Sequence, residues 1–153
     1  WGQPQVRLRT VTEEFARDSF ENLVFGLCRF QECTGHYPER LALVGWSFKE
    51  RRFHIYLKAL RWPLEAFEHH GVNNPPNIGL AVEQEQRAIA RFRQLLAGNS
   101  SSFLAKREQR NPWRRTPPYA LSCPELSEFL RSWERGAWLP PSRFPWERTE
   151  SCR

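Results

Sequence analysis

The spacing of apolar and polar residues predicts three strands in the first half of the chain. Residues 6–11 alternate apolar and polar side chains, which is typical of a half-buried strand. Residues 41–46 form a continuous apolar run, which is typical of a strand buried on both faces of a parallel sheet. Residues 64–70 form a weaker strand candidate. Helices are predicted to begin near residue 18 and near residue 49, just after the first two strands.

Polar residues at these two helix starts have the spacing of a capping box, in which a side chain caps a helix and an acid follows three residues later. Asp18 precedes Glu21, and Ser47 precedes Glu50. From Phe20 onward the apolar residues recur at helical spacing. The simplest interpretation of Asp18 and Glu21 is that they only cap this helix.

The second half of the chain predicts two further helices and an irregular end. A helix is expected over 79–97, with Glu85 on its apolar face as either a solvated residue or part of a site. Another is expected from near residue 122 to about residue 135. Residues 136–153 contain several Pro, Trp and Arg residues and are predicted to form an irregular tail.

Strand, polar cap and helix follow one another twice, which predicts an α/β domain with a parallel sheet. Ligands of open parallel sheets bind at the carboxyl ends of the strands. Glu13 and Glu21 would act as acid/base or hydroxyl-binding groups, Asn22 would orient the ligand, and Lys49 and Arg52 would hold an anion. The carboxylates of Glu13 and Glu21, the Asn22 amide and the Arg52 guanidinium are expected to converge in one cleft at this edge of the sheet. The full candidate set is Glu13, Asp18, Ser19, Glu21, Asn22, Ser47, Lys49, Arg52 and Glu85.

The chain carries a formal charge of +6, with 20 Arg and 3 Lys. Such a surplus suits phosphorylated ligands, nucleic acid or an anionic membrane. The alternative explanation, which we favour for most of the Arg bias, is a GC-rich coding sequence. Basic residues beside an aromatic could bind phosphates and stack a base, so a nucleic-acid-binding or interaction surface is the alternative function. A solvated Arg-rich connection is the other interpretation of this segment, whose basic residues are Lys106, Arg107, Arg110, Arg114 and Arg115.

The four cysteines and the absence of familiar motifs limit the chemistry. Cys33 and His36 could share a metal, but two further ligands at suitable spacing are missing, so no metal site is predicted. Free thiols favour a reducing compartment, and we expect a cytoplasmic protein. No apolar run is long enough to cross a membrane. Common phosphate-binding and hydrolase motifs are also missing from the sequence.

Several of these residues resemble the YdcF-like, or DUF218-domain, proteins, most closely their fungal branch. The family has an acid at a strand end, then a polar-aromatic-Glu-Asn segment opening a helix, then a buried strand with a polar turn and an Arg. The likeness spans roughly residues 6 to 130. The matching residues are Glu13, Asp18-Ser19-Phe20-Glu21-Asn22, Val44-Gly45-Trp46-Ser47-Phe48-Lys49, Arg52, Gly71, Pro75-Pro76, Glu85 and Arg110 through Tyr119.

This resemblance implies a Rossmann-like three-layer fold, a parallel sheet with helices on both faces. It implies a small nucleotide-like or anionic ligand, with S-adenosylmethionine suggested for some bacterial members, but no established reaction. Residues 1–135 would be the C-terminal part of the domain, with an N-terminal strand missing, as the lack of any Met also suggests. Phe25 or Trp46 would then be partly exposed at an unpaired strand edge. An inert interaction scaffold is a third possibility.

Overall fold

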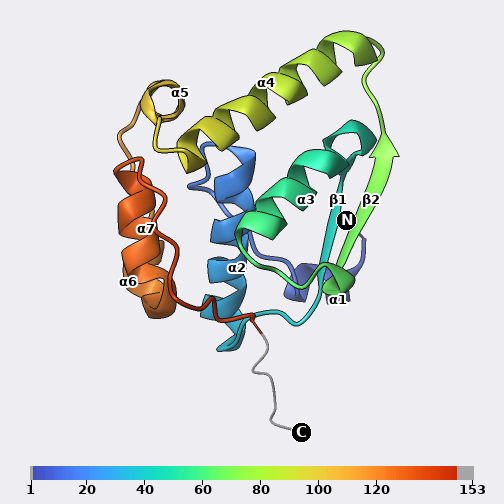
Figure 1. The fold of residues 1–153 in the computed structure, drawn as a ribbon. Helices are drawn as coiled ribbons and strands as arrows, with labels where there is room; N and C mark the ends of the chain where they lie inside the picture. The colour runs from blue at the N-terminus through green and yellow to red at the C-terminus, as the bar shows by residue number, and fades with distance from the viewer. Residues whose placement is uncertain (1, 148–153) are drawn as a thin grey trace, which may run out of the picture.

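The computed structural model describes residues 2–147 (Figure 1). Its two strands are β1 (Leu41–Trp46) and β2 (Phe67–Asn73). Short 3-10 turns precede α3, β2 and α7. The α-helices are α1 (Pro4–Leu8), α2 (Ser19–Thr34), α3 (Glu50–Ala59), α4 (Ile78–Leu96), α5 (Ser101–Gln109), α6 (Tyr119–Ser122) and α7 (Ser127–Glu134).

The fold class predicted from the sequence is wrong. The described chain is mostly helical, and its single sheet has two strands, so it is not a three-layer Rossmann-like structure. The two strands do run parallel, with α3 as the crossover between them, and Leu41 lies opposite Phe67 in the register. The local pattern of strand, turn, helix and strand at residues 41–73 was therefore predicted, but the larger sheet was not.

The strand expected at residues 6–11 is absent, and α1 occupies its first half. Pro4 stands in the first turn of α1, a position where its fixed φ suits a helix and its missing N–H costs nothing. Val6, Leu8 and Val11 are all exposed, so the alternation has no buried face to serve. The alternation is present in the sequence, but among residues 2–147 no strand pairs with this segment.

The sheet is covered on one face only, whereas the apolar run predicted burial on both. Leu41 and Leu43 are half-buried and pack against the core, while Val44 is 67% exposed. Trp46 is 42% exposed, as expected for a partly open aromatic. Phe25 is buried, against expectation, because it lies on the core face of α2.

Helix packing around Phe20 forms the centre of the core. The ring of Phe20 lies 5.3 Å from Tyr56 of α3, 5.1 Å from Phe92 of α4 and 4.4 Å from Trp133 of α7, measured between ring centroids. Such aromatic pairs add to the stabilisation that burial of their area provides. Because Phe20 lies in the first turn of α2, the helices meet at that end of α2 (Figure 1).

Residues 136–147 are irregular, as predicted, but they belong to the core. Phe144 is fully buried, and the indole N–H of Trp146 donates to the Leu60 carbonyl over 2.8 Å. Arg61 donates to the carbonyls of Pro141 and Ser142. This segment therefore closes over the end of α3. The rest of the predicted tail, residues 148–153, lies outside the described residues.

The predicted helices from near 18 and 49 and over 79–97 are confirmed as α2, α3 and α4. The last predicted helix is observed as a 3-10 turn followed by α7. From the sequence, no helix was expected at α5, and the basic segment from Lys106 was interpreted as a solvated Arg-rich connection or a nucleic-acid-binding surface. The two buried residues of α5, Phe103 and Arg107, are four apart, so a helical face was present in the sequence.

Candidate functional site

The N-terminus of α2 lies between two groups of charged side chains. Asp18 caps the helix: its carboxylate accepts hydrogen bonds from the backbone N–H of Phe20 and Glu21 at 2.8 and 2.9 Å. Burial and the nearby Glu21 charge both raise the pKa of Asp18. The capping interpretation of Asp18 is confirmed. Its carboxylate accepts hydrogen bonds from the helix N-terminus that an anionic ligand could otherwise accept.

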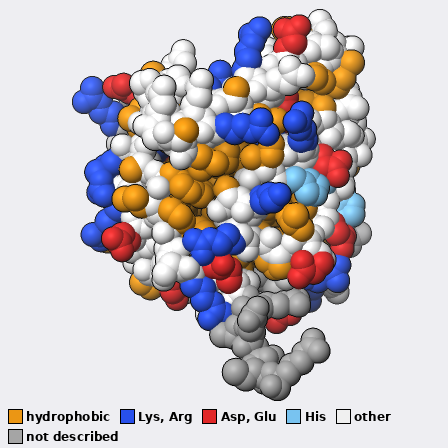
Figure 2. Space-filling view, viewed as in Figure 1, with side chains coloured by type: hydrophobic (Ala, Val, Ile, Leu, Met, Phe, Trp, Pro, Cys, Tyr) orange, Lys and Arg blue, Asp and Glu red, His pale blue; other side chains and the backbone are white. Residues whose placement is uncertain are grey.

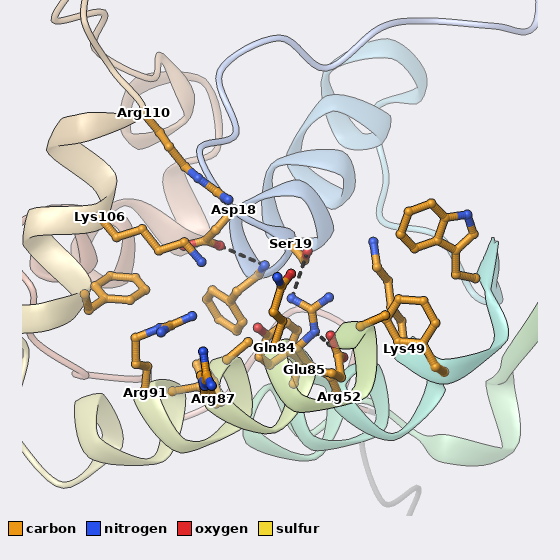
Figure 3. Close-up of a pocket in the computed structure, with 18 residues that line it drawn as sticks. Asp18, Ser19, Lys49, Arg52, Gln84, Glu85, Arg87, Arg91, Lys106 and Arg110 are labelled. Carbon is orange, nitrogen blue, oxygen red and sulfur yellow. Dashed lines mark hydrogen bonds and ion pairs between the residues drawn. The ribbon is translucent and has the colours of Figure 1, made fainter. Parts of the chain in front are cut away.

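In front of this helix end lies a cavity of about 400 Å³, which we call the cationic cleft (Figure 3). Residues from α2, the turn before α3, α3, α4 and α5 line it. Its aromatic wall includes Trp46 and Phe48. Its charged and polar side chains are Asp18, Ser19, Lys49, Arg52, Gln84, Glu85, Arg87, Arg91, Lys106 and Arg110.

Arg52 and Glu85 form a buried ion pair across the floor of the cleft. The Arg52 Nε donates to a Glu85 carboxylate oxygen over 2.6 Å, and Arg52 Nη1 donates to the Ser19 hydroxyl over 3.1 Å (Figure 3). Each of the two charged side chains is about 9% exposed. This contact joins α2, α3 and α4 and brings together three residues that the sequence placed far apart. Glu85 thus lines the cleft and is buried in an ion pair rather than solvated.

The other cations of the cleft are poorly balanced. Lys49, Arg91 and Lys106 have no ion pair among the described residues, and Arg87 has only an exposed pair with Glu83 at 3.5 Å. Burial, together with the neighbouring Arg52 charge, lowers the pKa of Lys49. Burial, together with the charges of Arg110 and Arg91, lowers the pKa of Lys106. These ammonium groups are therefore partly desolvated and repelled by neighbouring cations. A bound anion would compensate for the lost water and offset the repulsion.

A second cavity, the side compartment, adjoins the cleft. Its volume is about 470 Å³, and it shares Asp18, Ser19, Trp46, Lys49 and Arg110 with the cleft. Its remaining wall comes from the segment before α2, from α2, from β1 and from Phe53 of α3. The residues that line only this compartment are Ala16, Arg17, Asn22, Leu43, Val44, Gly45 and Phe53.

Glu21 lies behind the helix in a separate group, the sealed ion cluster of Arg17, Glu21, Arg107 and Glu134. Glu21 is fully buried and accepts hydrogen bonds from Arg17 and from the Trp133 indole N–H at 3.1 Å. Arg107 lies 3.0 Å from Glu21 and also contacts Glu134. The expectation that the Glu21 carboxylate meets Arg52 is therefore wrong. It contacts Arg107 of α5 and Trp133 of α7 and so holds α2, α5 and α7 together.

Two more candidate residues lie away from the cleft. The Glu13 carboxylate accepts from the backbone N–H of Phe15 and Ala16, at 2.8 and 3.0 Å, and from the Tyr119 hydroxyl at 3.0 Å. Ser47 packs against the backbone of Gly71: a Cβ at Gly71 would lie 2.3 Å from the Ser47 hydroxyl, so only glycine fits there. Both residues therefore have structural contacts that explain them.

The structure thus brings Asp18, Ser19, Lys49, Arg52 and Glu85 into one cleft and places Asn22 in the neighbouring compartment. It adds an α4 wall that the sequence interpretation missed, including Gln84, Arg87 and Arg91. A signal for this wall was available. Residues 81, 84, 85, 88, 91 and 92 recur at spacings of three and four, the period of one helix face, and the face mixes polar and apolar side chains.

The basic segment 106–115 does not present its cations on one surface. Arg107 is buried in the sealed ion cluster. Arg110 donates to the Arg17 carbonyl at 2.8 Å, and the Arg115 guanidinium lies 4.3 Å from the Phe15 ring centroid. Arg114 is exposed. On the face shown in Figure 2, Lys and Arg side chains are spread around exposed apolar surface rather than gathered in one patch.

Two further observations concern other classes of site. Within residues 2–147, no group of three or more His, Cys, Asp or Glu side chains is arranged to hold a metal ion. None of the described helices is long and apolar enough to cross a membrane.

One curated protein is similar to this chain. It is the uncharacterized protein YOR238W of Saccharomyces cerevisiae, 31% identical over 128 residues, a match that covers 74% of this chain and 42% of the yeast protein. The chain thus spans less than half the length of this relative. No protein-family model matches the chain, and no solved structure matches it. Membership of the YdcF-like family therefore stays a prediction.

Proposed function

We propose that this protein binds a small anionic molecule, bearing phosphate or carboxylate groups, in the cationic cleft. The observation that carries the proposal is the imbalance of charge around an open cavity. Lys49, Arg91 and Lys106 face it without an acidic partner among the described residues. Guanidinium and ammonium groups are the usual ligands of phosphate and carboxylate in proteins. No reaction follows from this arrangement.

The acidic side chains of the cleft do not neutralise its unpaired cations. The Arg52–Glu85 pair fixes the floor, and Asp18 is held by the helix end. Both acids of the cleft are therefore engaged by the protein, and neither neutralises the remaining cations. A cavity of about 400 Å³ is within the range of ordinary ligand pockets.

S-adenosylmethionine, which the family resemblance implies, is a poor match for this cleft. Its sulfonium and ammonium outnumber its one carboxylate, so the molecule is positively charged at neutral pH. Six cationic side chains against two acids would repel it. We therefore favour an anion over this cofactor. The cytoplasm remains the proposed compartment, since Cys28 and Cys123 are buried free thiols.

Calorimetric titration of the full-length protein with pyrophosphate tests the anion site. Arg91→Gln and Lys106→Gln should each weaken binding about tenfold, because each removes a charge facing the cavity. Arg93→Gln is the matched control, since Arg93 is exposed on α4 and does not line the cleft. Equal affinity in all three variants, or no binding of pyrophosphate at any concentration tested, would contradict the proposal.

Salt dependence separates the anion site from the alternative of nucleic-acid binding. Binding along a phosphate backbone releases many counterions, so affinity falls by orders of magnitude between 50 and 200 mM salt. A small ligand in the cleft should lose much less. A steep salt dependence with single-stranded RNA or DNA, abolished by changes at Arg114 and Arg115, would favour the alternative.

A further inference from the structure

We propose that the ligand of the cationic cleft is a nucleoside polyphosphate, with its phosphates in the cleft and its base on Trp46 at the entrance to the side compartment. This inference rests on the proposed anion site and specifies the class of ligand. Three independent features support it: the size of the charge surplus, an aromatic surface at one end, and unpaired hydrogen-bonding groups beside that surface.

The charge surplus is larger than one phosphate monoester can balance. Six cationic side chains and two acids leave four positive charges in the cleft. A phosphate monoester carries close to two negative charges at neutral pH. Figure 3 shows Arg87, Arg91, Lys106 and Arg110 at one end and Lys49 at the other, with Arg52 between them. A chain of two or three phosphates would reach several of these groups at once.

The aromatic surface lies at the Lys49 end of the cleft. The Trp46 and Phe48 rings are 5.4 Å apart between centroids, and the Lys49 ammonium lies 4.8 Å from the Trp46 ring centroid. Trp46 is 42% exposed and lines both cavities. A large aromatic side chain left open beside a cationic cavity is the arrangement on which nucleobases stack.

Groups that could hydrogen-bond the edge of a base line the side compartment, as Trp46 does. The exposed Asn22 lines the side compartment and offers both a donor and an acceptor. β1 pairs with β2 along one edge, and within residues 2–147 no strand pairs with its other edge. Val44 and Gly45 of β1 line the same compartment. A base on Trp46 would thus meet polar groups as well as an apolar wall.

The test compares ligands that share phosphates but differ in the base. Calorimetry on the full-length protein would use pyrophosphate, inositol hexakisphosphate, adenosine, and the diphosphates of adenosine, guanosine, cytidine and uridine. At least one nucleoside diphosphate should bind about tenfold or more tightly than pyrophosphate, because stacking of one base contributes about this much. Adenosine alone should bind weakly.

Variants of Trp46 show whether the base is responsible. Trp46→Ala should weaken nucleotide binding much more than pyrophosphate binding, so that the preference for nucleotide over pyrophosphate falls to about one. Trp46→Phe should restore most of it, which also guards against loss through misfolding. Trp113→Ala is the matched control, since Trp113 is 82% exposed and lines neither cavity.

The outcomes distinguish this inference from the anion site itself. If pyrophosphate binds but no nucleoside diphosphate binds better, or if inositol hexakisphosphate binds best, the base assignment is overturned and the anion site survives. If Trp46→Ala weakens pyrophosphate and nucleotide equally, Trp46 does not contact a base and the inference also fails. If no anion binds, the proposed function fails with it.

Discussion

The sealed ion cluster and the cationic cleft both lie at the N-terminal end of α2, and they use charge in different ways. Behind α2, two Arg and two Glu residues neutralise one another, and Glu21 is completely excluded from solvent. In front of α2, six cations face two acids across an open cavity. The charges of the sealed ion cluster balance within the protein, whereas the cleft has more cationic than acidic side chains.

This difference separates structural charges from charges available to a ligand. Removing water from an ion is expensive, so a buried charge persists only where partners replace the water. The sealed cluster satisfies that condition with its own residues. The cleft leaves Lys49 and Lys106 with lowered pKa values because burial and like charges oppose their ionisation. Substitutions in the two groups should therefore have opposite profiles of stability and binding.

The largest effect is expected in the sealed ion cluster. Glu21→Gln should lower the free energy of unfolding by about 3–5 kcal/mol, because it leaves Arg107 buried without its full complement of charge. Urea unfolding followed by circular dichroism measures it. Glu134→Gln is the matched control, with a smaller loss expected because the Glu134 side chain is 44% exposed. A loss below 1 kcal/mol for Glu21→Gln would remove the distinction between the two groups.

The Arg52–Glu85 pair, which belongs to the cleft but is buried like the sealed cluster, should be intermediate. Arg52→Leu should cost about 2 kcal/mol, since Glu85 would remain on the cleft floor without its partner. Arg52→Leu combined with Glu85→Leu should recover most of that loss. A double-mutant cycle from urea unfolding measures the coupling. Additive losses would show that the two side chains do not depend on each other.

Tyr56, on the floor of the cleft, should make stability depend on alkaline pH. Burial raises the pKa of its hydroxyl to about 12, above the value of about 10 in an unfolded chain. The unfolded state thus loses its proton first, and stability present below pH 10 is lost as pH rises toward 12. The loss should be about 2 kcal/mol smaller in Tyr56→Phe, measured by urea unfolding between pH 9 and 11.5. Parallel pH profiles would contradict it.

The smallest effect on stability should come from the unpaired cations. The combined change of Lys49, Arg91 and Lys106 to Gln should alter the free energy of unfolding by less than about 0.5 kcal/mol, with any change favourable, because these charges repel one another. The same variant should lose pyrophosphate binding in calorimetry. A stability loss comparable to that of Glu21→Gln would mean that the cleft cations are structural.

Parts of the site could be predicted from the sequence because local rules place them. Asp18 lies at a helix start by its capping chemistry, and Lys49 and Arg52 follow the end of β1 within six residues. The same local rules did not predict where the Glu13 and Glu21 side chains lie. Their types and positions suit a site, but whether a carboxylate points to a cleft or to a buried Arg depends on residues far along the chain, such as Arg107 and Tyr119.

By itself, the sequence determined the elements whose signals lie within a few residues: the cap and apolar face of α2, the parallel β1–α3–β2 unit, and the length of α4. The tertiary structure decided what those elements pack against. Residues 6–11 alternate like a strand but have nothing to pair with, and residues 41–46 are apolar on both faces but covered on one. Val6, Leu8 and Val11 are exposed, and in β1 only Leu41 and Leu43 pack against the core. Burial is a property of neighbours that a local pattern does not specify.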